Sequence, residues 1–120
     1  MIPSLKQLIV GIAVFLAIDS IWLLTAGQYA MKMNERIQGS PVTFGLVAAL
    51  IVYIALSYLV YQVNTVVEAG LLGGAVYAVY DFTNLALLKK YETGLAIADT
   101  LWGSVLFASV FSVLKYIKLH

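Results

Sequence analysis

The sequence predicts an all-α, polytopic integral membrane protein, a single domain over residues 1–120 with four transmembrane helices in an up-down bundle. Hydrophobic residues make up 62% of the chain and charged residues only 11%, less than half of the roughly 25% charge in an ordinary soluble domain. A soluble fold of this length could not bury so much apolar surface. Four apolar stretches are also each long enough to cross a bilayer, which takes a helix of roughly 20 residues.

The first predicted helix covers about residues 5–26. Ser4 and Gln7, three residues apart, have the spacing of a capping box at its start. The apolar run is too long for a cleaved signal peptide, and Asp19 interrupts it. We therefore expect this segment to be a retained first helix.

The second predicted helix covers about residues 41–62. Ser40 is placed to cap it, and Pro41 suits the first helical turn, where no backbone N–H is needed. Only a few residues around Asn64 separate this helix from the next one. We therefore expect the second and third helices to form a tight antiparallel hairpin.

The third helix is predicted over about residues 66–88 and the fourth over about residues 95–117. Thr65 and Glu68 have capping-box spacing, and the charge of Glu68 also suits the positive start of a helix. The connection around Asn64 and the connection over residues 89–94 are both short. Short connections favour antiparallel packing of the helices that they join. The longer segment 27–39 mixes apolar with charged residues, so it is either a short amphipathic helix at the interface or a solvated loop.

Charge and composition exclude several function classes. Seven Lys and Arg against six Asp and Glu give a net charge of +1, which argues against nucleic-acid binding. There is no cysteine, and the single histidine is the last residue, His120; thiolate chemistry and a His–Asp pair inside the fold are therefore excluded. No cofactor fingerprint occurs, and we expect neither a cofactor nor a metal. Positive charges are divided equally between the two sides, so they do not select an orientation.

Three acids lie inside the predicted spans: Asp19, Asp81 and Asp99. An ionised carboxylate at mid-helix costs about 2.5–3.5 kcal/mol even on the lenient insertion scale, so such residues face the bundle interior, water or a partner. The up-down path puts all three in the same half of the membrane, on the side of segment 27–39. Like charges in such a site cannot all ionise cheaply, so at least one is expected to hold a proton.

Helical spacing predicts which side chains accompany these acids. On the third helix one stripe runs through Gly70, Gly74, Tyr77, Asp81 and Asn84. Its small residues allow close approach of another helix and also suit pairing with a second copy of the chain. Asn84 lies one turn from Asp81 and is expected to orient it. The predicted pocket for a ligand or proton consists of Asp19, Trp22, Tyr77, Tyr80, Asp81, Asn84, Asp99 and Trp102.

These acids and aromatic residues also have interpretations that involve no ligand. Asp19 and Asp99 could lie near enough to the headgroups to be solvated. Tryptophans and tyrosines often form interface belts, an alternative that applies to Trp22, Trp102, Tyr29, Tyr58, Tyr61 and Tyr91. Tyr53 is expected near mid-membrane, where its hydroxyl needs a hydrogen-bond partner.

The motif Tyr77-Ala-Val-Tyr-Asp-Phe-Thr-Asn84, followed by Asp99-Thr-Leu-Trp-Gly103, resembles the signature of the membrane-protein family catalogued as domain of unknown function 2177. The stretch Asp19-Ser-Ile-Trp22 is similar to the N-terminal pattern of that family. The resemblance covers nearly the whole chain. It implies four membrane helices and no established activity.

Three functions fit these observations. The first is a small carrier or ligand-binding membrane protein, with Asp81 as the group that takes up and releases a proton. The second is a membrane-embedded enzyme that acts on a lipid or isoprenoid, with Asp81 or Asp99 as general acid and base. The third is a structural or partner-binding role, in which the polar residues hold helices together. The expected partners are the lipid bilayer and an unidentified small molecule.

Overall fold

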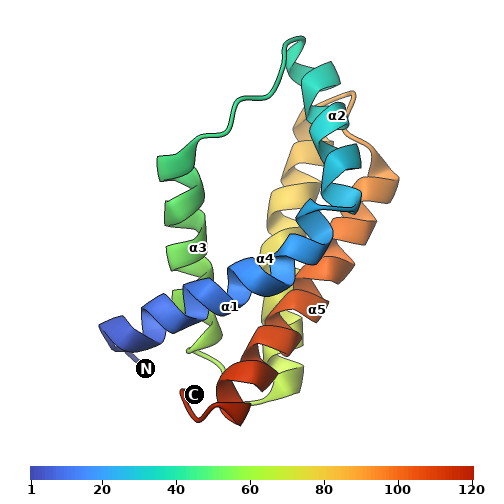
Figure 1. The fold of residues 1–120 in the computed structure, drawn as a ribbon. Helices are drawn as coiled ribbons and strands as arrows, with labels where there is room; N and C mark the ends of the chain where they lie inside the picture. The colour runs from blue at the N-terminus through green and yellow to red at the C-terminus, as the bar shows by residue number, and fades with distance from the viewer.

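The computed structural model describes residues 1–120 and contains five helices and no strand, which confirms the all-α class (Figure 1). The helices are α1 (Leu5–Leu23), α2 (Ala26–Gln38), α3 (Leu46–Val60), α4 (Val66–Leu87) and α5 (Thr93–Tyr116). Two of them, α1 and α5, are long and apolar enough to cross a membrane, whereas α3 is apolar but has only 15 residues.

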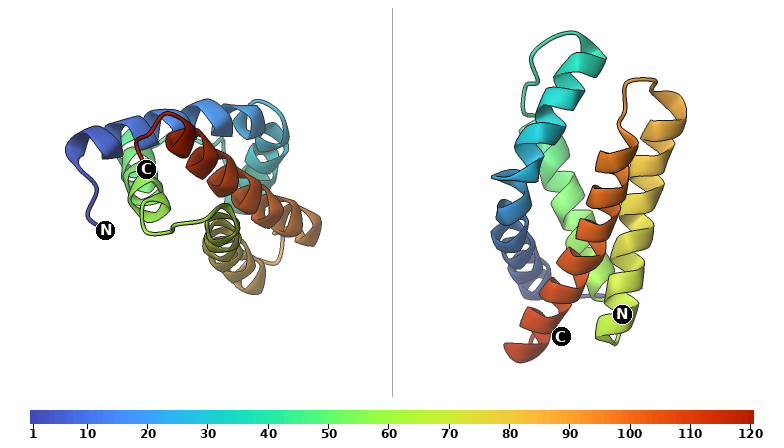
Figure 2. Two further views of the ribbon diagram at one scale, coloured as in Figure 1. Left: turned by 90° about the horizontal axis from the view of Figure 1, so that it is seen from below. Right: turned by 90° about the vertical axis from the view of Figure 1, so that its right-hand side faces the viewer.

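The chain alternates in direction along the long axis of the molecule. α1 and α2 lead away from the N-terminus, α3 returns, α4 leads away again and α5 returns, so that both termini lie at one end (Figures 1 and 2). α4 packs along α5, and α1 packs across α3 and α5. The α2–α3 and α4–α5 connections therefore lie together at the end opposite the termini.

Segment 27–39, for which a helix and a loop were both open, is mostly helical. α2 buries Met33 on one side. It ends at Gly39, whose φ of 74° is a left-handed conformation that glycine adopts without a steric penalty. The structure thus adds a fifth, largely exposed helix between the first and second of the predicted four.

The predicted start of the second helix at Pro41 is wrong, because α3 begins at Leu46 after the N-cap Gly45. The side-chain amide of Gln38 donates to the carbonyl oxygens of Ser40 and Pro41 at 3.0 and 2.9 Å. These bonds attach the end of α2 to the non-helical connection that precedes α3.

The two predicted capping boxes have different outcomes. At α1 the box of Ser4 and Gln7 is complete, which confirms the prediction. At α4 the Thr65 hydroxyl accepts from the Glu68 N–H, but the Glu68 carboxylate accepts from the N–H of Asn64 rather than from that of Thr65. Only half of the second box is therefore formed, although both side chains still cap backbone donors.

Small residues lock α4 against α5. A Cβ at Gly73 would lie 2.2 Å from the carbonyl oxygen of Gly103, and a Cβ at Gly103 would lie 2.4 Å from the ring of Tyr77. The Ser104 hydroxyl donates to the carbonyl of Gly70 at 2.8 Å. The glycine stripe predicted on the third helix is thus covered by α5 of the same chain.

The interior is filled toward the end that carries the termini. Phe15, Phe107 and Phe111 are buried there, with the rings of Phe15 and Phe107 edge to face at 5.1 Å. Only 21 of 120 residues are buried, whereas large apolar side chains are exposed on every helix. An exterior of this kind suits a hydrocarbon solvent rather than water.

Candidate functional site

Asp19 is buried and both of its carboxylate oxygens accept hydrogen bonds. The indole N–H of Trp102 donates to Oδ1 at 2.8 Å, and the hydroxyl of Tyr53 donates to Oδ2 at 2.5 Å. Asp19 is 6% exposed, so the alternative that it is a solvated residue at a helix end is wrong. Its carboxylate joins α1, α3 and α5, and it supplies the partner that the Tyr53 hydroxyl was expected to need.

The two tryptophans lie against each other. The rings of Trp22 and Trp102 stack with centroids 5.8 Å apart and an interplanar angle of 16°. Trp102 also holds Asp19, as described above. The pair therefore joins α1 to α5, with both rings partly buried.

Asp81 on α4 is completely buried, and only one of its oxygens has a donor. The Tyr91 hydroxyl donates to Oδ1 at 2.7 Å, whereas Oδ2 is buried without any donor. A buried acceptor without a partner costs about 1–3 kcal/mol. Such an orphan in an otherwise satisfied interior is a candidate ligand contact.

Tyr91 was interpreted as an interface-belt residue, and this is wrong. Its backbone N–H donates to the carbonyl of Leu88 at 3.1 Å, in the short connection after α4, and the side chain is buried. Burial and the hydrogen bond to Asp81 raise the pKa of the Tyr91 phenol above its ordinary value. It therefore stays a proton donor to Asp81 throughout the physiological range.

Asp99 on α5 is half-buried, and its carboxyl lies beside that of Asp81. A carboxylate only accepts hydrogen bonds, and a protonated carboxyl can also donate one. The neighbouring acid could therefore supply the donor that Asp81 lacks only when it carries a proton. The two acids form a carboxyl pair, and we call Asp81 and Asp99 the acid pair below.

Two cavities lie against this acid pair: both acids line the first, and Asp99 alone lines the second. The first has a volume of about 240 Å³ and lies beneath α2, at the end opposite the termini. The polar and aromatic residues that line it are Trp22, Asn34, Tyr80, Asp81, Tyr91 and Asp99. The second, of about 340 Å³, lies between α3 and α4 and is lined by Val52, Leu56, Val76, Tyr77, Tyr80 and Asp99. Tyr80 and Asp99 therefore line both cavities.

Most of the predicted pocket residues line at least one of the two cavities, but three of them do not. Trp22, Tyr77, Tyr80, Asp81 and Asp99 line a cavity, whereas Asp19, Asn84 and Trp102 line neither one. Asn84 lies beside the hydroxyls of Tyr80 and Tyr91. No group of three or more acidic or histidine side chains is arranged to hold a metal ion.

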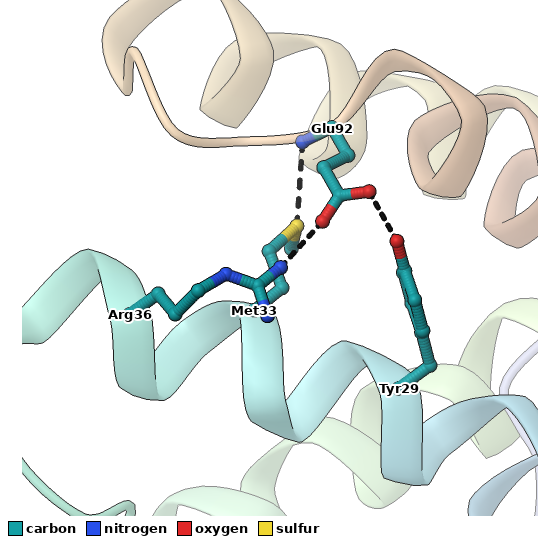
Figure 3. A network of polar contacts seen from close by, with 4 residues as sticks. All are labelled: Tyr29, Met33, Arg36 and Glu92. Atoms are coloured by element: carbon teal, nitrogen blue, oxygen red, sulfur yellow. Dashed lines mark hydrogen bonds and ion pairs between the residues drawn. The ribbon is translucent and has the colours of Figure 1, made fainter.

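A polar cluster that the sequence did not predict holds α2 over the first cavity (Figure 3). The carboxylate of Glu92 accepts from the Tyr29 hydroxyl and forms an ion pair with Arg36 at 2.5 Å. The Glu92 N–H donates to Sδ of Met33 at 3.3 Å. We call Tyr29, Arg36 and Glu92 the clasp. The available signal was the pair of opposite charges, Arg36 and Glu92, in the two segments that the sequence predicted to lie on the same side.

A helical chain with an apolar exterior and two buried aspartates, Asp19 and Asp81, has the character of a membrane protein. The chain belongs to the family of predicted membrane proteins catalogued as domain of unknown function 2177, whose model matches residues 4–117. This confirms the resemblance found in the sequence. No curated protein and no solved structure matches the chain.

Proposed function

We propose that the protein is a four-span membrane protein that binds a small organic cation at the acid pair and releases a proton when it does so. The single observation that carries the proposal is Asp81, fully buried beside Asp99, with one oxygen that lacks a donor and with a cavity against it. The proposal has three parts: the span arrangement, the choice of a cation, and the exchanged proton.

The distribution of charge supports four spans. The molecule is 44 Å long, which is close to the roughly 40–45 Å thickness of a bilayer with its headgroups. Every Lys, Arg and Glu lies near one of the two ends of the helical path, and the three aspartates are the only charged side chains between them. The exposed Leu46, Ile51 and Ile54 also make α3 apolar on its outer side, as a lipid-facing helix requires.

The lining of the first cavity favours a cation as the ligand. It combines two carboxyl groups with the rings of Trp22, Tyr80 and Tyr91, and no Lys, Arg or His lines it. Aromatic faces attract cations through their quadrupole, and cages of this kind recognise quaternary ammonium groups. An anion would meet repulsion and no compensating charge.

Proton release follows from the crowding of the pair. Two adjacent carboxyl groups in a partly buried site do not both ionise cheaply without a cation, so they share a proton when no cation is bound. The other titratable groups around the pair are Asp19, Tyr77, Tyr80 and Tyr91, none of which brings a positive charge. A bound cation takes over the role of the proton, which leaves. A proton-coupled carrier would use the same exchange.

Binding of benzyltrimethylammonium to the protein in phosphatidylcholine nanodiscs tests the proposal, with proton release read from calorimetry in buffers of different ionisation enthalpy. We expect release of about one proton per bound cation. Asp81→Asn should weaken binding by about tenfold or more. Asp99→Asn should bind without proton release, because no second carboxyl remains to share a proton.

The matched control is Asp19→Asn, which changes a buried acid that lines neither cavity. We expect this variant, once folded, to bind the cation with a far smaller loss of affinity than Asp81→Asn, because Asp19 acts on the acid pair only through its charge and lines neither cavity. Wild-type protein that does not bind the cation, or an Asp81→Asn variant that binds it normally, would contradict the proposal.

A further inference from the structure

The two cavities share residues, and this suggests a ligand longer than a compact cation. Tyr80 and Asp99 line both cavities, so a molecule whose positive group contacts the acid pair can extend past them into the space between α3 and α4. α3 packs on α1 and barely touches α4, which leaves this space unfilled by protein.

The second cavity is apolar apart from its inner end. Val52 and Leu56 of α3 face Val76 and Tyr77 of α4, and Asp99 is the only charged residue in the lining. Val52 and Tyr80 are exposed at its rim. The cavity is therefore a lateral groove that opens where the four-span arrangement places hydrocarbon.

We propose that the ligand is a single-chain cationic amphiphile, such as a long-chain amine or quaternary ammonium compound, with its head at the acid pair and its hydrocarbon chain in the lateral groove. The inference rests on the proposed function and names its substrate class. The carboxyl groups of Asp81 and Asp99 in the lining of the first cavity mark the position of the head, and the two residues common to both linings, Tyr80 and Asp99, mark the path of the chain.

The charges of the site also exclude the ordinary lipids as preferred occupants. Neither cavity contains a Lys, Arg or His to hold a phosphate, and the acid pair would repel one. Because lipid tails surround the protein already, burial of the chain gives little selectivity by itself. The head provides the selectivity, and the groove determines which chains fit.

The test compares a long and a compact probe on variants that fill the groove. Val52→Phe places a larger side chain at the exposed rim, so the fold should tolerate it. In phosphatidylcholine nanodiscs it should weaken the binding of dodecyltrimethylammonium, kept below its micelle-forming concentration, by about tenfold. It should leave the binding of benzyltrimethylammonium unchanged.

Val47→Phe is the matched control, because it makes the same change on the same helix at an exposed position outside the groove. It should alter the binding of neither probe. Val76→Phe, which fills the groove from α4, should repeat the effect of Val52→Phe. Dodecyl sulfate, with the same chain and a negative head, should not compete with dodecyltrimethylammonium.

The outcomes separate the two proposals. Unchanged binding of dodecyltrimethylammonium in both groove variants, with normal binding of the compact cation, overturns the amphiphile and leaves the cation site intact. Equal competition by dodecyl sulfate overturns selection by charge. Failure of wild-type protein to bind either cation overturns the proposed function itself.

Discussion

Asp19 and Asp81 are both buried acids in the same half of the molecule, yet their surroundings differ. Asp19 accepts from Tyr53 and Trp102, one donor for each oxygen, and lines no cavity. Asp81 accepts only from Tyr91, keeps one oxygen unpaired and faces a cavity beside a second acid. Burial alone therefore does not separate the two acids, whereas the number of their protein donors does.

The difference also divides the hypotheses drawn from the sequence. A carboxylate whose acceptor capacity is used by neighbouring helices fits the structural hypothesis, and this describes Asp19. A carboxyl pair with an unused acceptor fits the ligand-binding hypothesis, and this describes Asp81 with Asp99. Substitutions at Asp19, Tyr91 and Glu92 test the difference between the two acids. We describe them in order of decreasing expected effect.

Asp19→Ala should lower stability more than the other two. It leaves the Tyr53 hydroxyl and the Trp102 N–H without their acceptor and removes the contact that joins α1, α3 and α5. We expect a loss of about 2 kcal/mol, seen as a lower unfolding temperature in detergent. Asp19→Asn keeps one acceptor and should lose about half as much.

The folded fraction of Asp19→Ala should still bind benzyltrimethylammonium. A variant with normal thermal stability and no cation binding would reverse the two roles. Asp19 would then belong to the site, and the comparison would fail.

Tyr91→Phe should have an intermediate effect, because it removes the only protein donor to Asp81. We expect a loss of about 1 kcal/mol in the same unfolding assay. Tyr58→Phe provides the control, since Tyr58 is exposed and its hydroxyl makes no hydrogen bond in the structure. Equal stability of the two variants would show that the hydroxyl of Tyr91 contributes nothing at Asp81.

The clasp should give the weakest effect, visible only in titration. The hydrogen bond to the Glu92 carboxylate raises the pKa of the exposed Tyr29 phenol above its ordinary value of 10.0. Its contribution is therefore fully present below that pH and is lost as the pH rises through the higher folded-state pKa. Tyrosine ¹³Cζ NMR, assigned with Tyr29→Phe, should show this raised midpoint.

Glu92→Gln removes the negative charge and should return the Tyr29 midpoint toward 10.0. Identical titration in the wild type and in Glu92→Gln would mean that the clasp does not form. α2 would then not be held over the first cavity, whereas Asp19 and Asp81 would be unaffected.

The elements that the sequence predicted correctly are those with local signals. The capping box of Ser4 and Gln7 and the cap at Thr65 need only a few neighbouring residues, and both are present. The start of α3 was misplaced because Pro41 is a good first residue of a helix locally, whereas Gln38 bonds the nearby carbonyls. The tight hairpin predicted for the second and third helices is wrong, because α3 packs on α1 and barely touches α4 despite the short connection at Asn64.

The candidate site was predicted less completely, because its partners are distant in sequence. The in-span acids could be chosen from the cost of a charge in lipid alone. Tyr53 and Trp102, which donate to Asp19, are separated from it by 34 and 83 positions in the sequence. In the clasp, Tyr29 and Arg36 are separated from Glu92 by 63 and 56 positions. Tyr91, only 10 positions from Asp81, was missed because a tyrosine in a connection usually lies at the interface.

The helical class and the apolar exterior could both be deduced from the amino-acid sequence, because hydropathy and helical period are properties of short segments. Which acid is satisfied, and which is left with an unpaired oxygen, emerged only from the packing of the helices. That outcome depends on which acid the Tyr53, Tyr91 and Trp102 side chains reach when the helices pack together. No local sequence pattern encodes these long-range positions.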